Sequence, residues 1–233
     1  DYMSSLTGKD DETLVAELTG VIFFDPVERQ WQTADEYLSG NVREKLRIAC
    51  SYAAPGFPKD GLADYAANVA ALERAQSKDL DASEIEVRLG ATWIDKEYIR
   101  QFMFELFEPA FYARRSIDVS YSEYTAEWNI KGKSAVGYGD INATMTYGTD
   151  RANAYRILED TLNLRDVRIY DTVYDADGTE RRVLNSKETT LAQQKQQAIK
   201  DAFQDWIWKD PDRRQTLVQK YNELFNSTRP REY

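Results

Sequence analysis

Short apolar runs separated by turn signals mark the N-terminal part of the chain. An acidic first turn opens a predicted helix over residues 10–18, and Gly20 follows as its end. The apolar run 21–24 predicts a buried strand, and residues 31–33 predict a returning strand before a turn of helix that runs to Leu38. A helix followed by a small hairpin is compatible with a winged-helix-like start.

Two predicted helices come next and form a helical hairpin. Apolar residues fall on one helical face over residues 42–54, and Asn41 with Glu44 three positions later resembles a capping box. Proline and glycine residues end this helix, and a second helix begins near Tyr65. A second helical hairpin is predicted from a short helix over 81–90 and a longer one that ends near Pro109.

The middle of the chain changes to strand periodicity. Apolar and polar residues alternate between positions 116 and 149, which predicts a small antiparallel sheet. A helix is expected from Tyr155 to about Asn163. Alternation then returns on both sides of a turn over 175–178, which predicts a β-hairpin.

The C-terminal tail reads as helical throughout. A broad apolar stripe over 198–207 precedes Pro211, which opens a final helix. The pattern as a whole predicts an α+β, helix-rich fold of helical hairpins plus a small antiparallel sheet. We expect a mainly helical part over 1–110, a mixed α/β part with the small sheet over 111–185 and C-terminal helices over 186–233, together forming one compact unit.

Charge and composition limit the classes of partner that the chain could bind. The chain of 233 residues is 42% apolar and 12% aromatic, as in packed globular proteins. Its formal charge of −10 disfavours a general grip on nucleic acid, which needs a basic face that releases counterions. Any contact with nucleic acid must therefore be local. Residues 186–233 carry nine basic and seven acidic side chains, a net charge of +2, whereas the residues before them carry −12.

The absence of histidine excludes several reaction classes. Without it there is no histidine general base, no histidine-assisted nucleophile and no zinc site of the mixed type. Cys50, the single cysteine, lies in a helical apolar pattern and is predicted to be a small core residue. No apolar run could span a membrane and no signal peptide is recognisable, so we expect a cytoplasmic location. The start on Asp1 and the end at Tyr233 suggest an excised piece of a longer protein, and the missing histidine disfavours an enzyme.

Motifs for cofactors and metals are weak. The nearest approach to a phosphate-binding loop, Gly137 to Asp140, lies between predicted strands and reads as a hairpin loop. Acidic residues near positions 171–180 do not match the spacing of a calcium loop and read as a polar turn. We therefore predict no catalytic residue, no cofactor and no metal ligand.

Two groups of residues could contact DNA. The first lies at the predicted start of the 42–54 helix, where basic side chains and helix N–H groups could meet phosphates; the second pairs basic side chains with a tryptophan, which suits single strands. The alternative is that the first group is a solvated helix face. The candidates are Asn41, Arg43, Lys45, Arg47, Trp208, Arg213 and Arg214.

Several short motifs together resemble a known family. They are Tyr37-Leu38-Ser39-Gly40-Asn41-Val42-Arg43-x-Lys45-Leu46, Leu89-Gly90-Ala91-x-Trp93-Ile94, Tyr147-Gly148-Thr149, Leu162-Asn163, Phe203-x-x-Trp206-Ile207-Trp208 and Tyr221-Asn222-x-x-Phe225-Asn226. The combination resembles a region of large bacterial and phage proteins, often carried on conjugative elements, that fuse an adenine-specific DNA methyltransferase to a Snf-type helicase.

The resemblance implies an intervening domain between those two catalytic parts, which would be its partners in the same chain. The methyltransferase and ATP-binding motifs of the family have no match in these residues. We therefore expect a non-catalytic accessory domain that assists DNA engagement and couples the flanking domains. A purely structural scaffold without DNA contact is the alternative.

Overall fold

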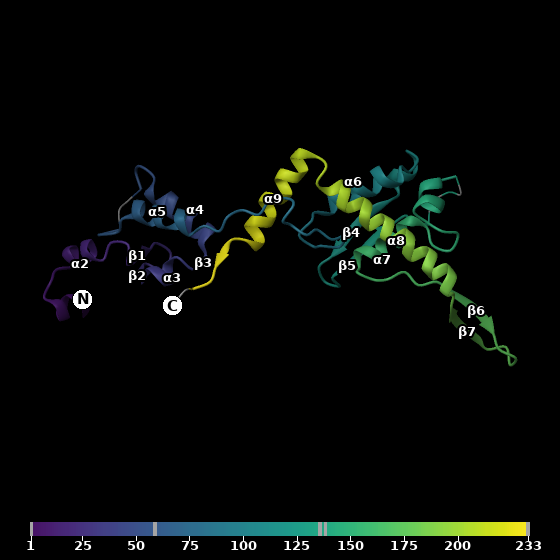
Figure 1. Ribbon diagram of the computed structural model, residues 1–233, viewed down its shortest axis with the longest axis horizontal. Helices are drawn as coiled ribbons and strands as arrows, with labels where there is room; N and C mark the ends of the chain where they lie inside the picture. Colours follow the sequence, from purple (N-terminus) through teal and green to yellow (C-terminus); the bar gives the residue numbers. More distant parts are fainter. Residues whose placement is uncertain (1, 58–59, 135–136, 138, 232–233) are drawn as a thin grey trace. The chain divides into compact units, whose positions relative to one another are not determined.

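The computed structural model describes residues 2–57, 60–134, 137 and 139–231, and these form two compact units. Unit 1 comprises Asp1–Glu84 and Val218–Tyr233, and unit 2 comprises Ile85–Leu217. This grouping differs from the three sequence segments expected to form one compact unit, because the chain leaves unit 1, builds unit 2 and then returns to unit 1 through its last helix. Figure 1 labels the helices and strands of both units.

The N-terminal part of unit 1 has the predicted order of a helix followed by a hairpin. Asp10 caps the helix, since its Oδ1 accepts a hydrogen bond of 2.8 Å from the Thr13 N–H. The two strands pair antiparallel with Phe23 opposite Gln32. The elements are α1 (Tyr2–Thr7), α2 (Asp11–Glu17), β1 (Ile22–Asp25), β2 (Gln30–Thr33) and α3 (Ala34–Tyr37).

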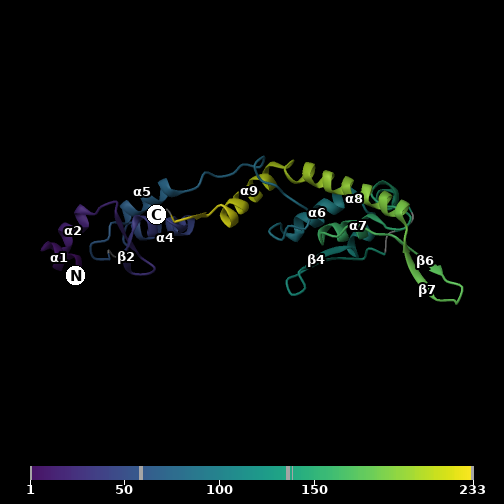
Figure 2. The same cartoon turned by 60° about the horizontal axis from the view of Figure 1, so that its bottom comes forward.

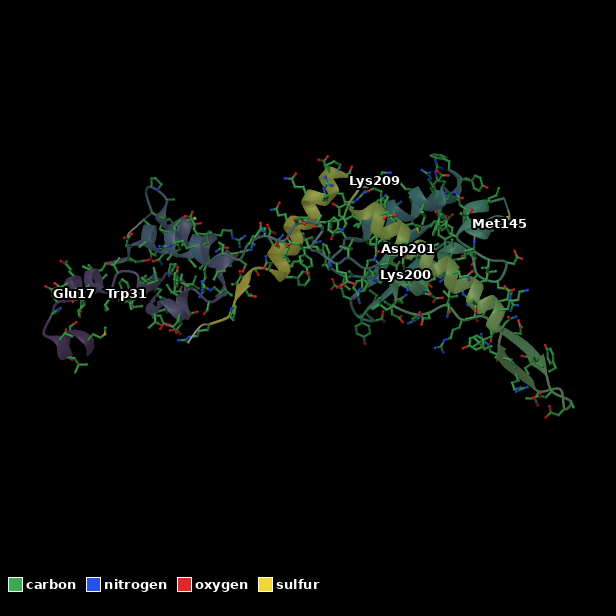
Figure 3. All side chains as sticks on the ribbon, viewed as in Figure 1. Glu17, Trp31, Met145, Lys200, Asp201 and Lys209 are labelled. Carbon is green, nitrogen blue, oxygen red and sulfur yellow. The ribbon has the colours of Figure 1, made fainter. Side chains whose placement is uncertain are left out.

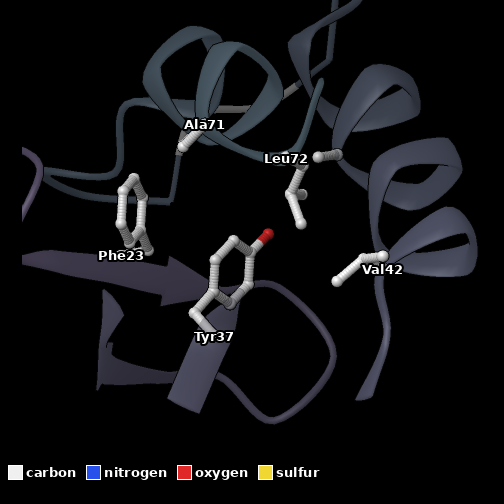
Figure 4. Close-up of a cluster of buried hydrophobic side chains, with 6 residues drawn as sticks. Phe23, Tyr37, Val42, Ala71 and Leu72 are labelled. Carbon is white, nitrogen blue, oxygen red and sulfur yellow. The ribbon is translucent and has the colours of Figure 1, made fainter. Parts of the chain in front are cut away.

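A helical hairpin of α4 (Val42–Ala53) and α5 (Tyr65–Ala75) completes the core of unit 1, as predicted. Figure 4 shows the buried cluster between these helices and the hairpin. The Asn68 side chain donates to the Tyr37 hydroxyl at 3.0 Å, so this buried oxygen has a partner. The cluster consists of Phe23, Tyr37, Val42, Ala49, Ala71 and Leu72.

The end of the chain closes unit 1. Within α9 (Pro211–Phe225), the Asn222 amide accepts from the Leu80 N–H at 2.9 Å and donates to the Leu80 carbonyl at 2.8 Å. Further along, β8 (Thr228–Arg229) pairs antiparallel with β3 (Gly40–Asn41). Backbone groups of Leu80 and β3 therefore find their partners more than 140 residues later in the sequence.

Unit 2 is built on helices that pack against one another and on a small sheet that one of them covers. Rings of α6 (Lys96–Phe107) and α8 (Ser186–Ile207) meet where Phe102 and Phe203 lie 5.0 Å apart, and α7 (Ala154–Leu162) also packs on α8 (Figure 2). The backbone N–H of Ile130 in the small sheet donates to the Glu159 carboxylate of α7 at 2.7 Å, so a helix side chain covers an open strand edge. The elements are α6 (Lys96–Phe107), η1 (Ala113–Arg115), β4 (Asp118–Ser122), β5 (Glu127–Lys131), the π-helical turn η2 (Asn142–Thr146), α7 (Ala154–Leu162) and α8 (Ser186–Ile207).

A second hairpin of unit 2, β6 (Tyr170–Tyr174) with β7 (Glu180–Leu184), is also as predicted. Its strands are mostly exposed, and β7 is exposed along its whole length. The fold is therefore α+β and helix-rich with two-stranded antiparallel sheets, which confirms the predicted fold class.

Two local predictions are wrong. Residues 81–90 form turns instead of a helix: the capping hydrogen bonds between Asp81 and Glu84 do form, but no helix follows them. The chain must instead approach α7 closely at Gly90, where a Cβ atom would lie 2.2 Å from the Leu162 carbonyl oxygen. Cys50 is exposed and lies outside the core, because it falls on the solvent flank of α4. The predicted Gly137 to Asp140 loop lies partly outside the described residues.

Candidate nucleic-acid interface

The seven DNA-contact candidates fall in two places, each inside one unit. Asn41, Arg43, Lys45 and Arg47, here called the α4 cluster, belong to unit 1. Trp208, Arg213 and Arg214, here called the α8–α9 cluster, lie at the junction of those helices in unit 2.

Asn41 acts as the predicted helix cap. Its Oδ1 accepts a hydrogen bond of 3.0 Å from the Glu44 N–H, and its backbone pairs with Thr228 in the β3–β8 ladder. The preceding Gly40 has a φ of +73°, a conformation that side chains rarely adopt. The Gly-Asn break thus turns the chain from a strand pair into α4.

Arg43 is held by its own unit. Its Nε donates to the Asn226 carbonyl at 3.2 Å, and its guanidinium forms an ion pair with Asp79. The side chain is only 24% exposed. The guanidinium of Arg43 therefore joins α4 to two loops of unit 1, that of Asp79 and that of Asn226. Some of its N–H groups are thus already used within the protein.

Lys45 is also directed inward. Its ammonium donates to the Tyr37 carbonyl at 2.9 Å and the Ser39 carbonyl at 3.0 Å, and it lies 5.3 Å from the centre of the Tyr37 ring. These carbonyls belong to the end of α3 and the turn after it, which lack partners within that helix. Burial lowers the pKa of Lys45 from its usual value, and burial raises the pKa of Tyr37 to about 12.

Arg47 is the exposed cation of the α4 cluster, with 76% of its side chain accessible. It forms an ion pair with Glu44 one turn earlier, and that hydrogen bond raises the pKa of the guanidinium. A hollow of about 450 Å³ lies beside it, and Arg43, Glu44 and Glu223 are among the residues that line it. A phosphate in this hollow would meet two carboxylates as well as two guanidinium groups.

Arg213 is buried, with 7% of its surface accessible. Its guanidinium donates to the Ile207 carbonyl at 3.0 Å and the Trp206 carbonyl at 2.6 Å, and it lies 3.5 Å from the centre of the Trp206 ring. It therefore caps the C-terminus of α8 and stacks on an aromatic face at the same time. Burial lowers the pKa of Arg213 from its usual value.

Trp208 and Arg214 remain accessible in the α8–α9 cluster. Trp208 is half-buried at the end of α8, and Arg214 is exposed with one guanidinium nitrogen 3.5 Å from the Trp208 carbonyl. Trp206, by contrast, lies under Arg213 and donates to Glu105 at 2.5 Å. The Arg214 guanidinium thus lies next to the Trp208 backbone at this junction, and both residues keep accessible surface.

The helix-capping role of Arg213 had a signal in the sequence. A basic residue shortly after a helix end can satisfy its last carbonyls, and Arg213 follows Ile207 by six positions. The inward direction of Lys45 had no such signal, because the carbonyls it reaches precede its own helix. The use of all seven residues as DNA contacts stays a prediction.

The acidic residues around the β6–β7 hairpin serve local structure. Asp171 accepts hydrogen bonds from Arg151 and Asn185 at 2.8 Å each, and these partners hold the pKa of its carboxyl below the usual value. Within the described ranges, no three cysteine or carboxylate side chains gather into a group that could hold a metal ion. Likewise, none of the helices in the described part of the chain has the length and apolar character to cross a membrane.

Comparisons with known proteins add two matches. Residues 1–32 match the family described as "Probable helicase, winged helix domain". Residues 88–227, more than half of the chain, match "Domain of unknown function (DUF8437)". No curated protein and no solved structure matches. The chain therefore belongs to the DUF8437 family.

Proposed function

We propose that this member of the DUF8437 family is a non-catalytic accessory domain of a helicase-containing protein. The observation that carries the proposal is the helicase winged-helix match over residues 1–32. The matched residues hold α1, α2, β1 and most of β2, so the match coincides with a real helix-and-hairpin unit. The part of the chain next to it supplies a packed scaffold of helices.

The finer form of the proposal follows from the resemblance of the sequence. The flanking domains would be an adenine-specific DNA methyltransferase and a Snf-type helicase, and the chain would couple the two and assist their engagement with DNA. The α4 cluster and the α8–α9 cluster are the candidate contacts. Of these, Asn41, Arg47 and Arg214 are exposed and Trp208 is half-buried, so they keep accessible surface for an outside ligand.

The second candidate function is a structural scaffold that does not touch DNA. Its support is the inward use of Arg43, Lys45 and Arg213, each of which donates to carbonyl groups of its own unit. A protein surface meant for phosphates would direct such cations outward. The acidic net charge of −10 points the same way.

Salt-dependent DNA binding distinguishes the accessory domain that contacts DNA from the structural scaffold that does not. Fluorescence anisotropy of labelled duplex and single-stranded DNA would be measured with the full chain at several salt concentrations. With Arg47 and Arg214 as the accessible cations, the slope of log affinity against log salt should be about −2 or shallower. Arg47→Ala and Arg214→Ala should each make that slope shallower by about one.

Two controls accompany this measurement. Arg29→Ala removes an exposed cation outside both clusters and should leave the slope unchanged. Mixing the chain with the separately produced helicase motor, followed by sedimentation, tests coupling without DNA. Absence of DNA binding at low salt together with a stable complex would favour the scaffold, and absence of both would overturn the accessory-domain proposal.

A further inference from the structure

The winged-helix segment has an electrostatic character opposite to that of a DNA reader. Residues 1–32 contain seven acidic and two basic side chains, a net charge of −5. A helix that enters a DNA groove must lie against phosphates, and proteins meet these with arginine and lysine. The helix α2 carries Asp11, Glu12 and Glu17 instead, all exposed.

Both cations of this segment are already paired. The Lys9 ammonium lies 2.5 Å from the Glu17 carboxylate, and the Arg29 guanidinium lies 3.3 Å from that of Asp60. The turn between β1 and β2, which corresponds to the wing, also exposes the carboxylate of Glu28. Neither the helix nor the wing therefore offers an unengaged positive charge to a phosphate.

One face of the β1–β2 hairpin is apolar and accessible. The strand register places Ile22, Phe24 and Trp31 on the same face, with Phe24 opposite Trp31 and their ring centres 5.5 Å apart. Ile22 and Phe24 are half-buried, and Trp31 is 40% exposed. The core cluster of unit 1 takes Phe23 from the other face. This outer face, here called the wing face, lies beside the exposed Val27 of the turn.

The net charge of −5 on residues 1–32 limits which kinds of ligand could cover the wing face. Figure 3 labels Glu17, one of the exposed carboxylates of α2, and Trp31 of the wing face. Phosphates of DNA would be repelled by a segment of charge −5, and so would a second copy of the same segment. A basic amphipathic protein segment is favoured both by apolar burial and by charge attraction, because its apolar side chains can cover the rings while its cations meet the carboxylates.

We propose that the wing face binds a basic amphipathic segment of a partner protein, with Trp31 and Phe24 as apolar anchors and Glu28 at the rim. Aromatic side chains in such positions commonly contribute most of the binding energy, whereas rim charges contribute to partner choice and association rate. The winged-helix segment then acts as a protein-docking module. This binding requires no DNA contact by either cluster described above.

A labelled synthetic peptide of 14 residues with alternating Lys and Leu serves as the probe, and a peptide of alternating Glu and Leu serves as its control. Fluorescence anisotropy with the full chain should show binding of the first peptide and none of the second. Trp31→Thr should weaken that binding at least tenfold. Tyr124→Thr, at an exposed position of the β4–β5 turn in unit 2, should leave it unchanged.

A charge-matched pair separates local docking from general attraction. Glu28→Lys and Glu123→Lys change the net charge equally and both lie in exposed hairpin turns. Only Glu28→Lys should weaken peptide binding, by about three- to tenfold. Because this position lies in a turn, it keeps the test valid if Trp31→Thr were to unfold the chain, which thermal unfolding followed by circular dichroism would reveal.

Three results would overturn the proposal. The first is equal peptide binding by Glu28→Lys and Glu123→Lys. The second is a loss of duplex DNA binding in Trp31→Thr at unchanged stability, which would make the wing a DNA contact. The third is a dimer in sedimentation that Trp31→Thr dissociates, which would identify a second copy as the occupant.

Discussion

The α4 cluster and the α8–α9 cluster reached the same arrangement from different sequences. In each, one cation donates to the carbonyls at the end of a helix and a neighbour stays at the surface: Lys45 beside Arg47, and Arg213 beside Arg214. They differ in burial, since Arg213 is 7% exposed whereas Lys45 is half-buried. Helix ends therefore use basic side chains that could otherwise face an outside ligand, and we expect the more buried cation, Arg213, to contribute more to stability.

The largest expected difference in unfolding free energy is between substitutions of the neighbours Arg213 and Arg214 at the α8–α9 junction. Arg213→Ala leaves the last carbonyls of α8 without a donor in a buried place and removes the stacking on Trp206. We expect the free energy of unfolding to fall by about 2–4 kcal/mol. Arg214→Ala should change it by less than about 0.5 kcal/mol. Urea unfolding followed by tryptophan fluorescence measures both, and equal effects would contradict the assigned capping role.

The α4 cluster should repeat this contrast on a smaller scale. Lys45→Met keeps the aliphatic stem but removes the donor to the Tyr37 and Ser39 carbonyls. The expected loss of unfolding free energy is about 1–2 kcal/mol. Arg47→Ala, which breaks an exposed ion pair, should cost less than about 0.5 kcal/mol. If Lys45→Met were as mild as Arg47→Ala, the inward hydrogen bonds would not matter to stability.

Alkaline pH should affect the α4 region through Tyr37. Its pKa is about 12 in the folded state against an ordinary tyrosine value of 10.0, so the unfolded state loses this proton first as pH rises. The stability contribution is complete below pH 10 and is lost between pH 10 and 12. By pH 11 the loss is about 1.4 kcal/mol.

Urea unfolding at pH 9 and pH 11 measures this loss, with Tyr37→Phe as the comparison. The variant lacks the ionising hydroxyl, so its stability should fall less between the two pH values. An identical fall in both proteins would place the alkaline sensitivity elsewhere, for example at Tyr65 or Tyr155, whose pKa values burial also raises.

Loss of the helix cap of the α4 cluster should cost less than loss of its inward donor Lys45. Asn41→Ala removes the acceptor for the Glu44 N–H and should cost about 1 kcal/mol. Asn41→Asp keeps an acceptor oxygen and should cost little. Both are measured by the same urea titration. A large loss in Asn41→Asp would mean that the amide nitrogen of Asn41 has a role beyond the cap.

Local patterns predicted the elements of this fold well. The capped helix before the wing, the α4–α5 hairpin and the β6–β7 hairpin follow from caps, turn residues and periodicity, all of which act over a few residues. The helix expected over 81–90 failed although its start signal is real, because a capping box stabilises a helix end without supplying the apolar face that sustains a helix.

The candidate sites were harder to predict than the fold. A basic residue beside an apolar stripe looks the same whether it meets solvent, DNA or a carbonyl of its own unit. Arg43 depends on Asn226, which is 183 positions away, and no local pattern contains that pairing. The acidic character of residues 1–32 was readable from the sequence, but its meaning required the strand register that gathers Phe24 and Trp31 on one face.

The return of the chain to unit 1 has a consequence for synthesis on the ribosome. Asn222 and β8 satisfy backbone groups that were made more than 140 residues earlier, so unit 1 cannot finish folding until nearly the whole chain has emerged. Unit 2 is continuous and needs no such wait. During that interval Leu80 and β3 lack their native partners, and we expect unit 2 to fold before unit 1 is complete.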